Sequence, residues 1–200
     1  MTLYEIKPKF QNLLRPIVVK LHRWGVSANQ VTLLAMLISV ILGGLLMLFP
    51  VPFFFISLPI YLFFRMALNA IDGMLAREFN QQTTLGAMLN EVGDIISDAA
   101  LYLAFAFLAG VWPWLVVLVV LLSWLTEFCG VITQTLTRQR NYRGPLGKSD
   151  RAFLFGALGL GIALWPQYVA VANAVFIIAA VLLVWTCINR CRSALEAEHV

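Results

Sequence analysis

The sequence reads N-A-I-D-G-M-L-A-R from Asn69 to Arg77 and, after eight further residues, G-A-M-L-N-E-V-G-D-I-I-S-D from Gly86 to Asp98. Both segments place amides and carboxylates inside stretches that otherwise have the composition of membrane helices. Because polar and ionisable side chains are costly at that depth, each of them is a candidate functional residue. The two segments therefore predict two neighbouring membrane helices with a polar site between them.

The spacing of the polar residues puts them on one face of each helix. Asn69 and Asp72 are three residues apart, and Asn90 and Asp94 are four apart, so each pair shares a helical face. Two such faces can bring several oxygen ligands together around a hard divalent cation such as Mg²⁺ or Mn²⁺. A helix–helix interface held by small and polar residues is the other interpretation. Acids repeated on both helices favour the metal site.

The same residues resemble the signature of the CDP-alcohol phosphotransferase (CDP-alcohol phosphatidyltransferase) family, D-x2-D-G-x2-A-R-x8-G-x3-D-x3-D. The positions that agree in register, eight-residue gap included, are Asp72, Gly73, Ala76, Arg77, Gly86 and Asp94. Two positions depart from the pattern, because Asn69 and Asn90 stand where it has its first and third aspartates. The match is specific, since fixed residue types at fixed offsets rarely coincide by chance.

The resemblance implies an enzyme that moves a phosphatidyl group from CDP-diacylglycerol to an alcohol, releases CMP and makes a phospholipid. It implies that the first three signature positions hold divalent metal and that Asp94 deprotonates the acceptor alcohol. We expect Gly73, Ala76 and Gly86 to give the cytidine nucleotide close access to the helices, and Arg77 to pair with phosphate. The resemblance also implies a homodimer.

The two amides alter the expected metal site. An amide oxygen can ligate Mg²⁺ or Mn²⁺ but brings no charge, so the signature offers two carboxylates instead of four. Glu91 is a further candidate ligand, although it points about 100° away from its neighbour around the helix. The predicted metal ligands are Asn69, Asp72, Asn90, Asp94 and Glu91, holding one ion firmly and a second mainly alongside the substrate diphosphate. The competing hypothesis is an inactive member that persists as a nucleotide- or lipid-binding scaffold.

The composition is that of an integral membrane protein. Of 200 residues, 61% are hydrophobic and 12% charged, and the mean hydropathy is +0.86, which excludes a soluble domain. We expect an all-α fold in which residues 25–200 form six transmembrane helices. An amphipathic helix over residues 1–24 precedes them and lies in the interface against membrane lipids, kinked or divided at Pro16.

The six spans are expected over residues 29–49, 51–77, 85–109, 112–136, 152–165 and 168–188. The fifth is the shortest, and its glycines Gly156, Gly159 and Gly161 predict close packing against a neighbour. Ser27 and Gln30 predict a capping box at the start of the first span.

Two residues at the start of the first span are further candidates for the site. Asn29 and Thr32 resemble a Pro-Asn-x-x-Thr segment found in many members of the family, with Ala28 in place of the proline. By that resemblance they are expected to face the substrate. Capping of the helix alone would also explain them.

The charges indicate topology rather than nucleic-acid binding. The turns around residues 49–52, 110–114 and 165–169 carry no Lys or Arg. Six spans with both termini in the cytoplasm therefore satisfy the positive-inside rule. We expect the protein to lie in the inner membrane of a bacterium. A small transporter with an intramembrane cation site is a third hypothesis. Asp72 lies about 7 Å from the cytoplasmic end at Arg77. A transport path would need polar residues that continue to the far side, and the uncharged turns on that side argue against one.

A basic segment follows the fourth span. Its cations are Arg138, Arg140, Arg143, Lys148 and Arg151, and no run of acids accompanies them. They are expected to bind an acceptor phosphate or anionic lipid, with the positive-inside rule as the other explanation. By resemblance, members that use phosphorylated alcohols bind the acceptor phosphate in this region. A glycerol phosphate-like acceptor is therefore the first expectation.

A second polar cluster is predicted deeper in the membrane. Arg65, Asp98 and Glu127 each lie about 16–18 Å from the cytoplasmic end of a different span. At that depth a charge needs a partner, so the sequence predicts a buried ionic triad in which Arg65 neutralises Asp98 or Glu127.

Overall fold

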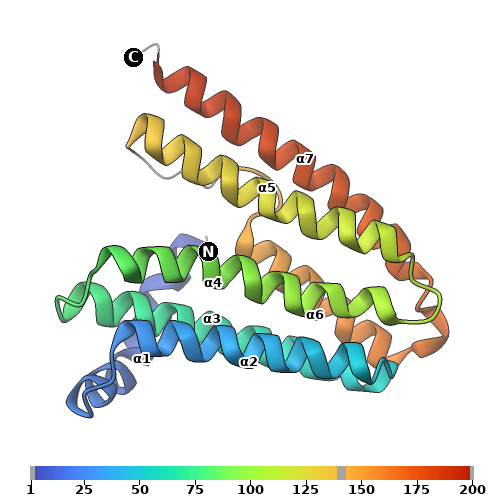
Figure 1. Ribbon diagram of the computed structural model, residues 1–200, viewed down its shortest axis with the longest axis horizontal. Helices are drawn as coiled ribbons and strands as arrows, with labels where there is room; N and C mark the ends of the chain where they lie inside the picture. The colour runs from blue at the N-terminus through green and yellow to red at the C-terminus, as the bar shows by residue number, and fades with distance from the viewer. Residues whose placement is uncertain (1–2, 139–142, 199–200) are drawn as a thin grey trace.

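The structure, a computed structural model, describes residues 3–138 and 143–198, and this part of the chain is helical (Figure 1). Its α-helices are α1 (Leu3–Arg23), α2 (Ala28–Leu48), α3 (Ser57–Glu78), α4 (Thr84–Leu103), α5 (Pro113–Thr137), α6 (Lys148–Leu164) and α7 (Val171–Glu198). Short 3₁₀ turns extend the helix ends at η1 (Pro52–Ile56), η2 (Ala104–Phe107) and η3 (Pro166–Tyr168).

Four stretches of the described chain are long and apolar enough to cross a membrane. They are Ala28–Leu48, Pro52–Glu78, Pro113–Thr137 and Val171–Glu196. The helices α4 and α6 do not belong to this set, because α4 carries three acids and α6 has only 17 residues. The all-helical membrane class is confirmed, while six spans and an interfacial α1 remain predictions.

The N-terminal part agrees with the sequence in one respect and differs in another. The capping box at the start of α2 is present, with Ser27 and Gln30 each accepting a hydrogen bond from the other's backbone N–H. The predicted division of α1 is wrong, because the helix runs through Pro16 without interruption. Leu14 and Val18 are buried in an apolar cluster with residues of α2 and α3, and this packing offsets the backbone hydrogen bond that a proline loses.

Small residues set how closely the helices approach. In Figure 1, α2 packs on both α4 and α3, α5 packs on α7, and α6 packs on α3. A Cβ at Gly43 of α2 would collide with the backbone carbonyl of Ala100 in α4. A Cβ at Gly159 would lie 2.9 Å from the backbone oxygen of Phe55, which confirms the predicted close packing there. Gly161 has no such neighbour within 4 Å.

The larger of the two apolar core clusters joins residues of α2 to α7. It contains a chain of aromatic rings. The ring centroid of Phe105 is 5.0 Å from that of Phe55 and 5.6 Å from that of Phe176, and the centroids of Phe155 and Phe176 are 5.6 Å apart. These rings come from η1, η2, α6 and α7, so they fix α6 against the end of α4. That packing positions the first turns of α6 beside the polar face of α4.

Candidate active site

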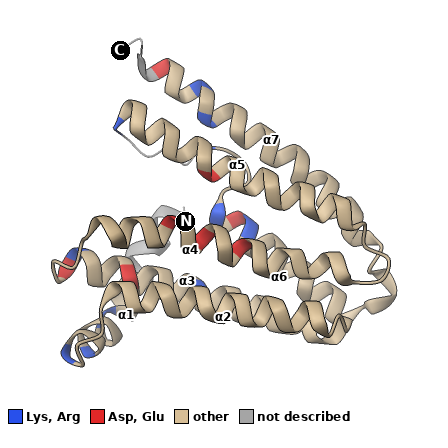
Figure 2. Cartoon of the chain, in the orientation of Figure 1, with Lys and Arg blue, Asp and Glu red and all other residues tan. Residues whose placement is uncertain are grey.

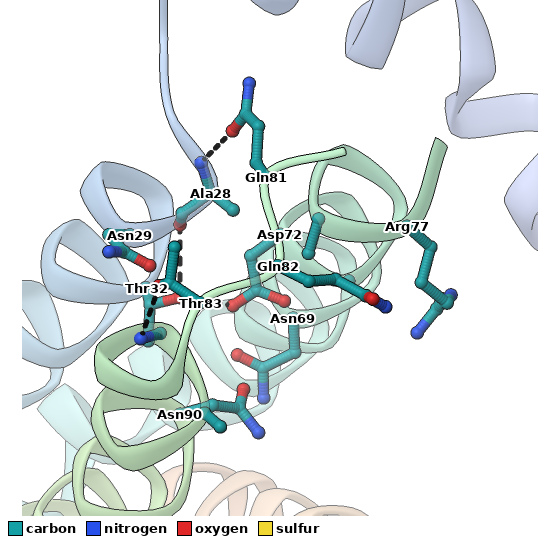
Figure 3. Close-up of a pocket in the computed structure, with 14 residues that line it drawn as sticks. Ala28, Asn29, Thr32, Asn69, Asp72, Arg77, Gln81, Gln82, Thr83 and Asn90 are labelled. Atoms are coloured by element: carbon teal, nitrogen blue, oxygen red, sulfur yellow. Dashed lines mark hydrogen bonds between the residues drawn. The ribbon is translucent and has the colours of Figure 1, made fainter. Parts of the chain in front are cut away.

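A cavity of about 360 Å³ opens where the start of α2, the second half of α3 and the start of α4 meet (Figure 3). It is lined by Ala28, Asn29, Thr32, Asn69, Asp72, Gly73, Ala76, Arg77, Gln81, Gln82, Thr83, Gly86, Ala87 and Asn90. Nine of these were singled out in the sequence: Asn29, Thr32, Asn69, Asp72, Gly73, Ala76, Arg77, Gly86 and Asn90. The two polar helical faces therefore meet across a cavity, as their spacing predicted.

Asp72 is the one carboxylate in the described wall of this cavity. It is 5% exposed, and its Oδ2 accepts a hydrogen bond of 2.7 Å from the hydroxyl of Thr32. The same hydroxyl lies 3.2 Å from the backbone oxygen of Ala28, one turn back in α2. Thr32 thus holds the carboxylate in one orientation, as Figure 3 shows.

Two glycines keep the cavity open. A Cβ at Gly86 would lie 2.7 Å from the side-chain oxygen of Asn29 and 3.0 Å from that of Thr83. A Cβ at Gly73 would lie 3.2 Å from the guanidinium nitrogens of Arg77, which folds back along α3. A larger residue at either position would fill space that a bound ligand needs.

Asp94 lies behind Asn69 and outside the cavity lining. Its Oδ1 accepts hydrogen bonds of 3.2 Å from the amide nitrogen of Asn69 and from Arg65. Its Oδ2 accepts a hydrogen bond from Lys148, in the first turn of α6. Asn69 therefore turns its amide nitrogen to Asp94 and keeps its amide oxygen available to the cavity. Glu91 is also absent from the cavity lining.

A buried ionic cluster continues from Asp94 towards the middle of the bundle. Arg65 pairs with Asp98 at 2.6 Å, and Asp98 also pairs with Arg151 at 3.0 Å. Arg151 is 3.1 Å from Glu127, and Arg190 is 3.7 Å from the same oxygen. Figure 2 shows basic and acidic residues gathered where the start of α6 meets α4.

The predicted pairing of Arg65 with Asp98 is confirmed, but the triad is part of a larger cluster. Glu127 joins it through Arg151 and not through Arg65 directly. Arg190 was missed because the sixth span was expected to end at residue 188, which put this arginine in the cytoplasm. In the structure α7 continues to Glu198 and Arg190 is 2% exposed. The absence of Gly or Pro after Ile188 is the sequence signal for that longer helix.

The basic segment lies apart from the cavity lining. Arg138 is the exposed C-cap of α5, in a left-handed conformation with φ of 58°. Arg143 pairs with Glu196 at 3.4 Å, with both side chains at least 70% exposed. Arg151 is 1% exposed within the ionic cluster, and Lys148 pairs with Asp94. Arg140 lies outside the described residues.

The donor set of the cavity suits one hard divalent cation. Asp72 supplies a carboxylate, and Asn69 and Asn90 supply amide oxygens, all from its wall. These are the ligands that Mg²⁺ and Mn²⁺ take, whereas His and Cys are absent from the lining. Within the described ranges no three Asp, Glu, His or Cys side chains group closely enough to hold a metal by themselves. The remaining ligands of such an ion would have to come from substrate oxygens or water.

Comparisons with known proteins agree with this arrangement. Residues 25–185 match a family model described as CDP-alcohol phosphatidyltransferase. The "Inner membrane protein YnbA" of Escherichia coli (strain K12) is 56% identical over 195 residues, which cover 98% of this chain and 97% of that protein. An "Uncharacterized protein" of Aquifex aeolicus (strain VF5) is 35% identical over 98 residues, covering 47% of this chain and 46% of its own length.

Solved structures share the fold. The phosphatidylinositol phosphate synthase (PgsA1) of Mycobacterium tuberculosis with CDP-DAG bound superposes with a TM-score of 0.74 at 21% identity, covering 90% of this chain and 92% of that one. The same synthase in complex with manganese and citrate gives a TM-score of 0.75 at 21% identity, covering 90% of this chain and 88% of that one. At that identity the likeness establishes the fold.

Proposed function

This chain belongs to the CDP-alcohol phosphatidyltransferase family, and on that premise we propose that it transfers the phosphatidyl group of CDP-diacylglycerol to an alcohol, with release of CMP. The observation that carries the proposal is the cavity, whose wall contains Asp72, Gly73, Ala76, Arg77 and Gly86 together. These are signature residues of the family on two different helices, and they converge on one space. The retention of Asp94 directly behind it supports an active enzyme over an inactive scaffold.

The position of the cavity suits an amphiphilic donor. It lies at the end of α3 and the start of α4, where the α3–α4 turn contributes Gln81, Gln82 and Thr83 to its wall. The apolar surface of α2 nearby is exposed at Leu33 and Leu37, as lipid-facing residues are. The nucleotide therefore enters from the aqueous side while the acyl chains stay in the bilayer. Asn29 and Thr32 face the nucleotide, and Arg77 donates to its phosphates.

A divalent ion, Mg²⁺ or Mn²⁺, neutralises the diphosphate of the donor when it is bound. Asp72, Asn69 and Asn90 hold it from the wall of the cavity, supported by the donor set described above. Asp94 and Glu91 are the candidate ligands for a second ion that comes with the substrate. A related fold crystallised with manganese supports this choice of metal without distinguishing Mn²⁺ from Mg²⁺.

Asp94 takes the proton from the acceptor hydroxyl in this proposal. Its Oδ1 is held by Asn69 and Arg65, whereas Oδ2 faces Lys148. The Lys148 side chain is 33% exposed and sits on a flexible stem, so it is the partner that can move aside. Release of Oδ2 by Lys148 therefore opens the base to the acceptor from the side of α6.

The membrane arrangement is proposed as six spans with both termini in the cytoplasm, α1 in the interface, and pairing as a homodimer. Four apolar helices and a relative named as an inner membrane protein support the inner membrane of a bacterium. In this orientation the exposed Arg138 and Arg143 lie at the cytoplasmic surface, near anionic headgroups.

The test is CMP release by the purified protein from CDP-diacylglycerol with Mn²⁺ and a panel of alcohols. The expected result is release that depends on both metal and alcohol and is lost in Asp72→Asn. A scaffold would bind the nucleotide without releasing CMP. A transporter would move solute in sealed vesicles without consuming CDP-diacylglycerol. Either result would overturn the proposal.

A further inference from the structure

The basic segment from Arg138 to Arg151 has acidic partners that its own sequence does not contain. In sequence these cations appear in excess, which is why they suggest a phosphate-binding role. In the structure the acids come from other helices. Arg143 pairs with Glu196 of α7, Lys148 with Asp94 of α4, and Arg151 with acids of α4 and α5.

The pairing is tightest at Arg151, which is 1% exposed. One of its terminal nitrogens lies 3.0 Å from Asp98 and 3.1 Å from Glu127, and the other donates at 3.2 Å to the hydroxyl of Thr126. Both terminal nitrogens are therefore engaged by groups of this chain, while the buried Nε has no hydrogen-bond partner among the described residues. A phosphate that bound both terminal nitrogens would have to displace one of these groups.

Glu127 occupies the place between two arginines that an anionic ligand would take. A single oxygen of this carboxylate lies 3.1 Å from Arg151 and 3.7 Å from Arg190. Arg190 also donates to the backbone oxygen of Thr126. Both arginines are at most 2% exposed and Glu127 is 8% exposed, so the three charges are desolvated together. Glu127 thus neutralises the two arginines that a substrate phosphate would otherwise neutralise.

We infer that the acceptor of this enzyme is an uncharged alcohol, such as a polyol, and not an alcohol that carries a phosphate monoester. The inference rests on the proposed function and names its acceptor class. It departs from the glycerol phosphate-like acceptor expected from the sequence. That expectation depended on a basic segment without matching acids.

The physical reason is the negative charge that already surrounds these arginines. A dianionic phosphate at Arg151 or Arg190 would bring two further negative charges beside Glu127 and Asp98, in the interior of the bundle, where these carboxylates already pair with the same arginines. It would also enter a site whose donor already brings a diphosphate. A hydroxyl compound without charge requires none of these ion pairs to break, and needs only Lys148 to leave one oxygen of Asp94.

The experiment compares matched acceptors in the CMP-release assay with CDP-diacylglycerol and Mn²⁺. The pairs are glycerol against glycerol 3-phosphate, and inositol against inositol 1-phosphate. We expect kcat/KM for the uncharged member to exceed that for its phosphate ester by about tenfold or more. Release that rises only with the phosphate esters would overturn the inference and leave the proposed function standing. Release with no alcohol at all would overturn both.

A variant tests the assigned cause. Glu127→Gln leaves the two arginines without their shared carboxylate, so the preference is expected to shift towards the phosphate esters by about tenfold. Glu196→Gln is the matched control, because it removes the partner of a cation of the same segment at an exposed site, and it is expected to keep the wild-type preference. An unchanged preference in folded Glu127→Gln would count against the inference. If that variant does not fold, the wild-type comparison still decides.

Discussion

The ammonium of Lys148, in the first turn of α6, is paired with the carboxylate of Asp94, in the middle of α4. The pair joins the segment where an acceptor would approach to the residue proposed as the base. Asn69 and Arg65 hold the other oxygen of the same carboxylate. Asp94 is therefore oriented from three sides, and Lys148 is far more exposed than the buried Arg65. Lys148 either covers the base until the acceptor arrives or binds the acceptor itself, and kinetics can distinguish these two roles.

Lys148→Met is expected to lower the KM for the acceptor by about threefold to tenfold and to leave the KM for CDP-diacylglycerol unchanged. The reason is that the acceptor no longer has to displace an ammonium from Asp94. Steady-state kinetics with both substrates varied measure this, with Lys148→Arg as the control that retains a cation. A higher acceptor KM in Lys148→Met would mean that this lysine binds the acceptor, as the sequence alone suggested.

Asp72→Asn is expected to abolish tight metal binding and to reduce CMP release by at least about a hundredfold, because it removes the one carboxylate in the described wall of the cavity. Titration of Mn²⁺ followed by electron paramagnetic resonance gives the affinity without relying on activity. Thr32→Val, which removes the 2.7 Å hydrogen bond to Asp72 but keeps the carboxylate, is expected to have a smaller effect. Two equally tight ions in the protein without substrate would contradict the single firm site.

The two amides are expected to respond differently when they are changed to aspartate. Asn90→Asp adds a charged ligand to the cavity wall and is expected to tighten Mn²⁺ binding by about tenfold or more. Asn69→Asp instead places a carboxylate where an amide nitrogen now donates to Asp94 at 3.2 Å. At that distance two like charges repel by roughly 5 kcal/mol at an effective dielectric constant near 20. Asn69→Asp is therefore expected to destabilise the metal-free protein.

Thermal unfolding in detergent, with and without Mn²⁺, measures this difference between the two amides. Metal is expected to restore most of the stability of Asn69→Asp, since a cation relieves the repulsion. Equal stability of the two variants without metal would show that the contact between Asn69 and Asp94 is unimportant.

The sequence predicted contacts between residues on helices adjacent in the chain better than contacts between helices far apart in the chain. Asp72 and Gly86 could be placed in one cavity because two adjacent helices joined by a short turn leave few ways to pack. Equal depth predicted that Arg65 pairs with Asp98 or Glu127, and the structure shows the pair with Asp98, which lies on the adjacent helix in the chain. The partner of Lys148 could not be predicted, since it depends on how α6 packs against α3 and α4. Arg190 was missed because hydropathy ends a span where charge begins, although a buried acid can keep an arginine inside.

In the ionic cluster, the unfolding free energies of single and double variants are expected to differ from those of an isolated ion pair. Arg65→Leu leaves Asp98 paired with Arg151 and is expected to cost about 3–5 kcal/mol of unfolding free energy. For an isolated pair, adding Asp98→Leu would restore stability. Here the double variant is expected to recover only part of the loss, because Asp98 also neutralises Arg151. Unfolding of the single and double variants in mixed micelles measures this, and complete rescue would show that the cluster behaves as separate pairs.

The width of the cavity can be tested at Gly86. Gly86→Ala brings a methyl group to 2.7 Å from the side-chain oxygen of Asn29 and 3.0 Å from that of Thr83. Both neighbours are side-chain ends that can rotate away, so the fold is expected to survive while the space for the nucleotide shrinks. The KM for CDP-diacylglycerol is expected to rise by about tenfold, with little change in the KM for the acceptor. Gly44→Ala is the matched control, because its Cβ would meet nothing within 4 Å. If Gly86→Ala bound CDP-diacylglycerol as well as Gly44→Ala does, the nucleotide would have to lie elsewhere than against the start of α4.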